Sequence, residues 1–135
     1  IVKSIEKIAE QTPKTLKVLV MGLAYKPNVS DLRESPALEI AKALSLNKKI
    51  SLTVFEPHIS NQDFISLKLS SCNHPILTEI ENSDLIAVLV AHDNFKEVIS
   101  SAKLSGKIIV DPTSIIEKNW KNKKDLKPIY FEKKT

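Results

Sequence analysis

Residues 16–46 read LKVLVMGLAYKPNVSDLRESPALEIAKALSL and contain, in order, the patterns of a strand, a loop and a helix. The run 16–22 is apolar at nearly every position, which is typical of a buried strand in a parallel sheet. The Ser-Pro pair at 35–36 predicts a helix N-cap and a first-turn proline, and apolar residues follow at helical spacing along 37–46. The loop 22–36 therefore lies at the carboxyl end of a strand, where open α/β sheets bind their ligands.

The rest of the chain alternates between strand and helix patterns in the same way. Further strands are predicted at 50–55, 85–90, 108–111 and 129–131, a short one at 76–77, and further helices at 1–11, 62–69, 78–82 and 95–102. Alternating strands and helices with short links favour a parallel sheet covered on both faces. The sequence therefore predicts an α/β fold with a doubly wound, mainly parallel, Rossmann-like sheet in three α/β/α layers.

Size and composition fit a small globular domain. The chain has 135 residues, of which 42% are hydrophobic and 27% charged, and no apolar run approaches the roughly 20 residues that a membrane helix needs. No membrane partner is therefore predicted. The chain begins at Ile1 without a signal-peptide pattern, and we interpret it as a piece of a longer polypeptide. Cys72 is its single cysteine, which excludes an internal disulfide and favours a cytoplasmic location.

The formal net charge of +4 is unevenly distributed along the chain. Seven lysines occupy the last eighteen residues: Lys118, Lys121, Lys123, Lys124, Lys127, Lys133 and Lys134. Such a run is usually a solvated surface. Because it contains no arginine and few aromatic residues, we predict no nucleic-acid partner.

The loop 22–36 carries the most informative charges. Lys26 and Arg33 are cations, and Asp31 and Glu34 stand beside them. The dinucleotide-binding fingerprint needs several glycines, whereas the whole chain has two. An anionic ligand would therefore be held by side chains, with Lys26 as a point charge and Arg33 as a bidentate donor. The alternative is that these are exposed loop charges without a ligand.

Other polar residues indicate no catalytic machinery. Glu56 follows a predicted strand, but without a glycine-rich loop a contact with a helix or a turn is favoured over a ribose contact. His92 follows another strand and would share an edge of the sheet with Lys26; a structural role is favoured over that of a general base. The three histidines match no zinc spacing, so no metal is predicted. Cys72 lacks a basic activator, so no catalytic residue is assigned.

The segment GLAYKPNVSDLRESPALEIAKAL, residues 22–44, resembles the start of the C-terminal domain of the UDP-glucose/GDP-mannose 6-dehydrogenase family. The residues of this segment look closest to those of the UDP-N-acetylmannosamine and related UDP-N-acetylhexosamine dehydrogenases. Three later segments resemble that family in the same order: VFEPH at 54–58, SDLIAVLVAH at 83–92 and IVD at 109–111. The resemblance covers roughly residues 16 to 116.

The resemblance implies a domain of a larger enzyme. Residues 1–13 would be the end of a linker helix from a central domain, and residues 14–135 the UDP-binding C-terminal domain. The full-length protein, a homodimer, would oxidise the C6 alcohol of a UDP-hexose to a carboxylate in surface polysaccharide synthesis. It would reduce two NAD molecules per turnover, bound mainly by an N-terminal domain. The catalytic cysteine would lie outside this chain, so the fragment alone is expected to be inactive.

The resemblance also assigns roles within the loop. Tyr25 and Lys26 would contact the UDP-sugar, and Arg33 would reach towards NAD or a neighbouring domain. Many relatives carry a cation just after the strand aspartate, but Thr113 stands there in this chain, which leaves the sugar open. A stand-alone, non-enzymatic nucleotide- or anion-binding module is the alternative interpretation.

Overall fold

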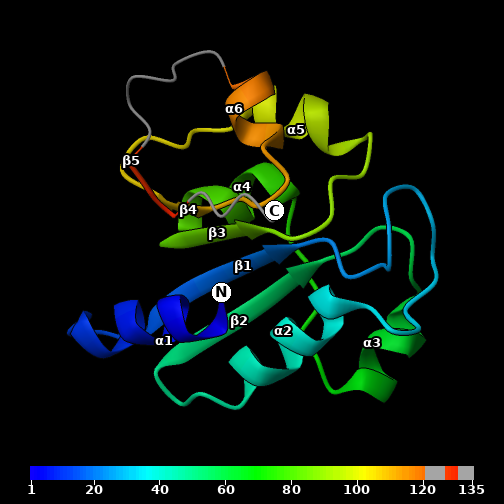
Figure 1. Cartoon of the computed structure of the whole chain (residues 1–135), viewed down its shortest axis with the longest axis horizontal. Coiled ribbons are helices and arrows are strands. Elements are labelled where there is room, and N and C mark those ends of the chain that lie inside the picture. The colour runs from blue at the N-terminus through cyan, green and yellow to red at the C-terminus, as the bar shows by residue number, and fades with distance from the viewer. Residues whose placement is uncertain (121–126, 131–135) are drawn as a thin grey trace.

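The computed structural model describes residues 1–120 and the backbone of residues 127–130. Its parallel sheet has the strand order β2-β1-β3-β4-β5 (Figure 1). The strands are β1 Leu16–Met21, β2 Ile50–Phe55, β3 Leu85–Val88, β4 Ile108–Val110 and β5 Lys127–Tyr130. The helices are α1 Val2–Gln11, α2 Pro36–Ser45, α3 Asn61–Leu67, α4 Ile76–Asn82, α5 Phe95–Ser101 and α6 Ile115–Asn119.

Strand β1 is the point at which the winding of the sheet reverses. It pairs with β2 along its whole length on one side and with β3 on the other. The chain runs from β1 outward to β2, then returns across β1 to β3. Doubly wound sheets bind ligands at such a switch point, beyond the carboxyl ends of the strands. A ligand is therefore expected at the loops that follow β1 and β3.

Alternating side chains of β1 supply two separate cores. Val18 and Val20 face one core, which contains Ile5 of α1, Leu38 of α2 and Phe64 of α3. Leu19 and Met21 face the other core, to which α4, α5 and α6 contribute buried Ile80, Phe95 and Ile116. Figure 1 shows these two groups of helices on opposite sides of the sheet. The predicted three-layer α/β/α architecture is confirmed.

The ends of the elements differ from the predictions in a few places. The expected strand at 76–77 is wrong, because these residues open helix α4, which follows Pro75 and buries Ile80 one turn later. Helix α6 was not predicted. The last predicted strand is present as β5, although residue 131 lies outside the described residues. Most of the lysine-rich segment, from residue 121 on, also has no described side chains.

In the part of the chain that the structure describes, no helix has both the length and the apolar character needed to cross a bilayer.

Candidate functional site

The loop after β1 begins with a glycine that the fold requires. Gly22 has φ +94°, a region that residues with a side chain rarely adopt. Its N–H donates to the carbonyl of Phe55, the last residue of β2, at 3.0 Å. A Cβ atom at this position would lie 2.7 Å from the Cβ of Val90, two residues past β3. Gly22 therefore brings the ends of β1, β2 and β3 close together.

Glu56 anchors the first residues of this loop from its place directly after β2. Its side chain is buried, and Oε1 accepts hydrogen bonds from the backbone N–H groups of Leu23 at 2.9 Å and Ala24 at 3.0 Å. Oε2 accepts the N–H of His58 at 3.0 Å. The interpretation of Glu56 as a turn partner is confirmed, since its oxygens are occupied by the protein's own donors.

The charge of Glu56 is stabilised despite its burial. Burial alone would raise the pKa of this carboxyl group, but hydrogen bonds from His92, Leu23 and His58 outweigh it and lower the pKa below the ordinary value. The carboxylate therefore remains ionised at neutral pH. It acts as an acceptor that holds the backbone in place rather than as a proton donor.

His92 connects this carboxylate to the middle of the loop. It is fully buried, its Nε2 lies 2.7 Å from Oε1 of Glu56, and its Nδ1 accepts the backbone N–H of Asn28 at 2.8 Å. Because Nδ1 is an acceptor, the ring proton is assigned to Nε2, which donates to Glu56. Asn28 completes the connection, since its Oδ1 accepts the N–H of Asp93 at 2.9 Å. The expected structural role of His92 is confirmed.

Two aromatic rings enclose the imidazole of His92. The ring of His58 lies 4.4 Å away between centroids, and that of Phe95 on α5 lies 5.1 Å away, edge to face. The third histidine, His74, is exposed and takes no part in this cluster. Among the described residues, no group of histidine, cysteine, aspartate and glutamate side chains is arranged to hold a metal ion.

The second half of the loop is organised by Asp31 and Arg33. The guanidinium of Arg33 forms a bidentate pair with Asp31, with Nε–Oδ1 at 3.1 Å and NH2–Oδ2 at 3.0 Å, and its backbone N–H also donates to Oδ1. The side-chain hydrogen bond from Arg33, followed by that backbone bond, lowers the pKa of Asp31. The carbonyl of Asp31 accepts the N–H of Tyr25 at 2.7 Å, which closes the loop on itself.

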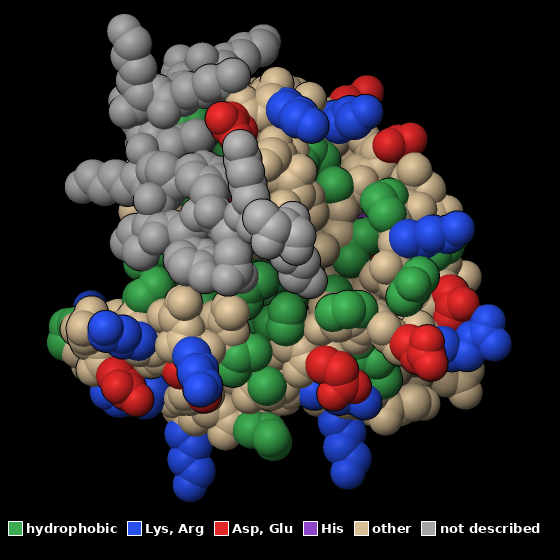
Figure 2. All heavy atoms as spheres, in the orientation of Figure 1, with side chains coloured by type: hydrophobic (Ala, Val, Ile, Leu, Met, Phe, Trp, Pro, Cys, Tyr) green, Lys and Arg blue, Asp and Glu red, His purple; other side chains and the backbone are tan. Residues whose placement is uncertain are grey.

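The two predicted substrate residues are accessible. Tyr25 is 56% exposed, and Lys26 is exposed and forms no ion pair with any of the described residues. A hollow of about 490 Å³ is lined by Tyr25, Asp31, Arg33 and Glu34. The structure thus brings Tyr25 and Arg33 to one hollow. Figure 2 shows charged side chains of both signs along the right-hand rim, where Figure 1 has the loop after β1.

The turn after β4 explains the missing cation at position 113. Asp111 is buried, and its Oδ1 accepts hydrogen bonds from the backbone N–H and the hydroxyl of Thr113 at 3.0 and 2.6 Å. Its Oδ2 accepts the N–H of Ile116, in the first turn of helix α6, at 2.9 Å. Thr113 is thus part of the turn that leads into α6, and its hydroxyl group is used by Asp111.

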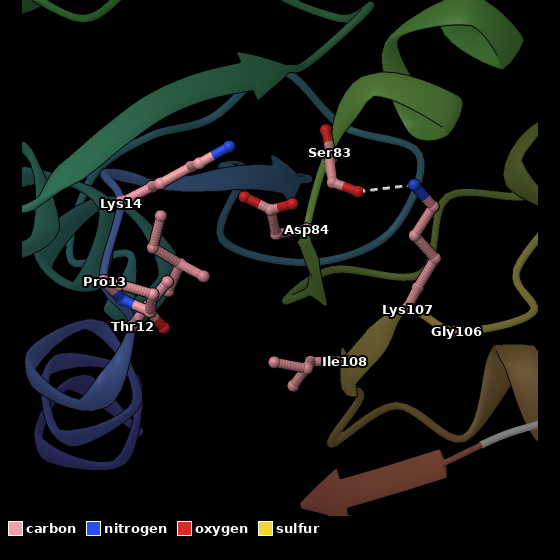
Figure 3. A pocket seen from close by; sticks show the side chains of 9 residues that line it. Thr12, Pro13, Lys14, Ser83, Asp84, Gly106, Lys107 and Ile108 are labelled. Carbon is pink, nitrogen blue, oxygen red and sulfur yellow. Dashed lines mark hydrogen bonds between the residues drawn. The ribbon is translucent and has the colours of Figure 1, made fainter.

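Another hollow, of about 350 Å³, lies at the opposite, amino edge of the sheet (Figure 3). Two of its charged side chains already join the turns that surround it. Nζ of Lys107 donates to the carbonyl of Ser83 at 2.6 Å, and Asp84 accepts the N–H of Lys17 at 2.9 Å. Ligands of open α/β sheets bind at the other edge. We therefore take the loop after β1, together with Glu56 and His92, as the candidate functional site.

The contacts between loops were the part that sequence reasoning missed. Asn28 and Asp93 were assigned no role, although Asn28 has φ +65° and asparagine is among the few residues that tolerate this region. An asparagine directly after a Lys-Pro pair was the available signal for a tight turn. Nothing in the local sequence indicated that its N–H would meet His92.

A doubly wound sheet with a cationic loop at its switch point is typical of a nucleotide-binding α/β domain. The comparison with known families makes the class specific. Residues 19–118 match the UDP-glucose/GDP-mannose dehydrogenase family, UDP binding domain. The chain therefore belongs to this family and corresponds to its UDP-binding domain, as the resemblance of the loop predicted.

Individual relatives agree with this assignment. A UDP-N-acetyl-D-mannosamine dehydrogenase of Methanococcus vannielii is 38% identical in an alignment of 112 residues that covers 78% of this chain and 24% of the relative. The enzyme of the same name from Escherichia coli K12 is 36% identical in an alignment of 102 residues that covers 74% of this chain and 23% of the relative. The chain thus spans about a quarter of the length of the curated relatives that it matches.

Solved structures support the fold. The native UDP-N-acetyl-mannosamine dehydrogenase of Staphylococcus aureus aligns with a TM-score of 0.67 and 25% identity, and the match covers 96% of this chain and 29% of that chain. A UDP-glucose dehydrogenase of Pyrobaculum islandicum aligns with a TM-score of 0.66 and 22% identity, covering 97% of this chain and 28% of that chain. These matches confirm the doubly wound α/β architecture.

Proposed function

We propose that this chain is the nucleotide-sugar-binding C-terminal part of a longer NAD-dependent UDP-sugar 6-dehydrogenase. Its substrate would be UDP-N-acetylmannosamine or a related UDP-hexose used in surface polysaccharide synthesis. The observation that carries the proposal is the loop within the family match, which presents exposed Tyr25 and Lys26 at the switch point of the sheet. The curated relatives named above are UDP-N-acetyl-D-mannosamine dehydrogenases.

In this proposal Lys26 contacts the diphosphate of the substrate. Its ammonium group is exposed and supplies three donors to phosphate oxygens. Tyr25, directly before it, offers an accessible ring surface to the uridine part. The backbone on both sides of these residues is held by Glu56 and His92, so the loop is ordered before the ligand binds.

NAD would be held mainly by another part of the longer protein. The loop after β1 contains one glycine, Gly22, and that residue is packed against Val90, so it cannot serve a pyrophosphate as a glycine-rich loop does. When bound, NAD accepts a hydride in each of the two oxidation steps. Arg33 is the residue that would reach towards NAD or a neighbouring domain, because its side chain is 89% exposed while paired with Asp31.

The remaining partners belong to the same proposal. Residues 1–13 would end a linker helix from the central domain; in this structure α1 already packs into the core of the domain through Ile5 and Ala9. The longer protein would be a cytoplasmic homodimer. This chain alone, without the cysteine-bearing part, would not reduce NAD.

Titration of the chain with UDP, followed by calorimetry, tests the proposal. We expect Lys26→Ala to raise the Kd for UDP at least about tenfold, since a charge-assisted hydrogen bond contributes about 1.5–3 kcal/mol. Lys42→Ala, at an exposed position on α2, is the matched control and should leave the Kd unchanged. Equal affinities of the Lys26→Ala variant and the wild type would overturn the proposed role of the loop.

A further inference from the structure

Three residues of the loop lie between two fixed backbone positions. The N–H of Ala24 donates to Glu56 and the N–H of Asn28 donates to His92, at 3.0 and 2.8 Å. Tyr25, Lys26 and Pro27 form the short span between them. The two acceptor side chains are themselves joined at 2.7 Å and are both fully buried. One pair of side chains therefore holds both ends of the span that carries Lys26.

We infer that His92 is a positioning residue for the nucleotide-binding loop, whose neutral imidazole sets the place of Lys26 by accepting the N–H of Asn28. The inference deepens the proposed function and rests on it as far as Lys26 meets the nucleotide. His92 would not touch the ligand itself. It acts through Asn28. The side-chain Oδ1 of Asn28 is held by a further hydrogen bond, which it accepts from the backbone N–H of Asp93.

The hydrogen-bond directions make this arrangement sensitive to the charge of His92. The N–H of Asn28 points at Nδ1, so a second proton on that nitrogen would place two donors against each other at 2.8 Å. The titratable groups that face the ring are Glu56, which would keep its hydrogen bond to Nε2, and His58, whose ring lies 4.4 Å away. Asp93 follows His92 in the chain but its side chain is 75% exposed. Protonation is therefore expected to release Asn28 while the contact with Glu56 persists.

Two substitutions distinguish the role of Nδ1 of His92 from that of Nε2. In His92→Asn the amide oxygen can take the place of Nδ1 and accept from Asn28, but the contact with Glu56 is lost. In His92→Gln the amide nitrogen can take the place of Nε2 and donate to Glu56, but Asn28 loses its acceptor. A merely structural role of His92 predicts similar effects of both variants. The positioning role predicts that the Gln variant impairs the loop and the Asn variant largely preserves it.

The experiment compares UDP affinity and amide hydrogen exchange of the chain for the two variants. We expect His92→Gln to raise the Kd for UDP about tenfold and to speed exchange of the amides of Tyr25, Lys26 and Asn28, because one hydrogen bond to a buried acceptor is lost. His92→Asn should remain within about threefold of the wild type. His74→Gln, at an exposed histidine, is the matched control and should change neither property. Equal losses in the Gln and Asn variants would overturn the inference.

NMR of the unaltered chain tests the same inference without a variant. We expect Nδ1 of His92 to carry no proton, and a scalar coupling to be detectable across the hydrogen bond from the amide of Asn28 to that nitrogen. A protonated Nδ1, or an Asn28 amide without this coupling, would refute the inference. If UDP fails to bind the wild type, the proposed function fails, while the NMR and exchange results still decide the role of His92.

Discussion

Gly22 and Val90 lie so close together that there is no room for a side chain at Gly22. A Cβ atom there would be 2.7 Å from both the Cβ and the carbonyl oxygen of Val90, and 2.9 Å from its nitrogen. The contact joins the end of β1 to the segment after β3, at the point where the winding of the sheet reverses. Because glycine tolerates a positive φ, Gly22 also lets the loop start in a left-handed conformation and turn towards Glu56.

Gly22→Ala is therefore expected to destabilise the chain strongly. The positive φ costs about 1–2 kcal/mol for a residue with a side chain, and the clash with the backbone of Val90 adds about 1–3 kcal/mol. Gly106→Ala is the matched control, since Gly106 has φ +78° but nothing within 4 Å of its Cβ position. It should cost about 1–2 kcal/mol, from the backbone alone. Urea denaturation of both variants measures the difference, and equal losses would contradict the importance of the Val90 contact.

Glu56 is expected to make the free energy of unfolding of the chain depend on pH in the acidic range. Its pKa in the folded protein is lowered from the ordinary 4.5, because hydrogen bonds from His92 and from the backbone outweigh the effect of burial. A group with a lowered folded pKa contributes stability above its unfolded pKa and loses that contribution as the pH falls through the folded value. The contribution of Glu56 should therefore be complete above about pH 4.5 and decline below it.

Glu56→Gln tests this directly. The amide replaces one acceptor oxygen by a donor, so we expect a loss of about 1–3 kcal/mol at pH 7. The difference from the wild type should narrow as the pH falls below about 4.5, because the carboxyl group is then protonated in the unfolded chain and, at still lower pH, in the folded chain as well. Urea denaturation at pH 7, 5 and 3 measures it. Glu97→Gln, an exposed first-turn residue of α5, serves as the control, and an equal loss at all three pH values for Glu56→Gln would contradict the argument.

Much of the fold was predictable because its signals are local. The Ser-Pro pair at 35–36 starts helix α2 as predicted, with Oγ of Ser35 accepting the N–H of Leu38 at 3.2 Å. Residues 76–77 were assigned wrongly because two apolar residues fit a strand as well as a helix, and only the burial of Ile80 decides between them. Helix α6 is five residues long, so its periodic signal was short.

The site was predictable only in part. Lys26 and Arg33 could be placed in a loop at the carboxyl end of a strand, because that follows from the order of elements. The hydrogen bonds that connect Glu56 to His92 and His92 to Asn28 could not be predicted, since these pairs are separated by 36 and 64 positions in the sequence. It depends on β2 and β3 both flanking β1, so that the turns after them meet the same loop. That arrangement is a property of the complete sheet.

Arg33 is expected to matter for function and not for stability. Its pair with Asp31 lies at the surface, where solvent screens ion pairs, so Arg33→Ala should leave the urea midpoint of the chain nearly unchanged. In the proposed longer dehydrogenase the same substitution should raise the KM for NAD about tenfold, if the guanidinium exchanges Asp31 for an anionic group of the cofactor. Lys96→Ala, another exposed cation paired with an aspartate, is the control. Unchanged KM values for both NAD and the UDP-sugar would refute the assignment of Arg33.

Cys72 is expected to be chemically idle. It is partly buried, its S–H donates to the carbonyl of His74, and burial, with a smaller effect of the charge of Glu79, raises the pKa of its thiol. Since the thiolate is the nucleophile, such a thiol reacts slowly at neutral pH. Cys72→Ser should therefore leave the rate of NAD reduction by the proposed longer dehydrogenase unchanged.

The thiol itself offers an independent measurement. In the isolated chain, Cys72 should react with a disulfide reagent at pH 7 more slowly than free cysteine does, and should approach the rate of free cysteine only after denaturation in urea. Fast labelling of the folded chain would contradict the burial and the raised pKa of the thiol. A loss of activity in a folded Cys72→Ser enzyme would contradict the view that its catalytic cysteine lies in a different part of the longer protein.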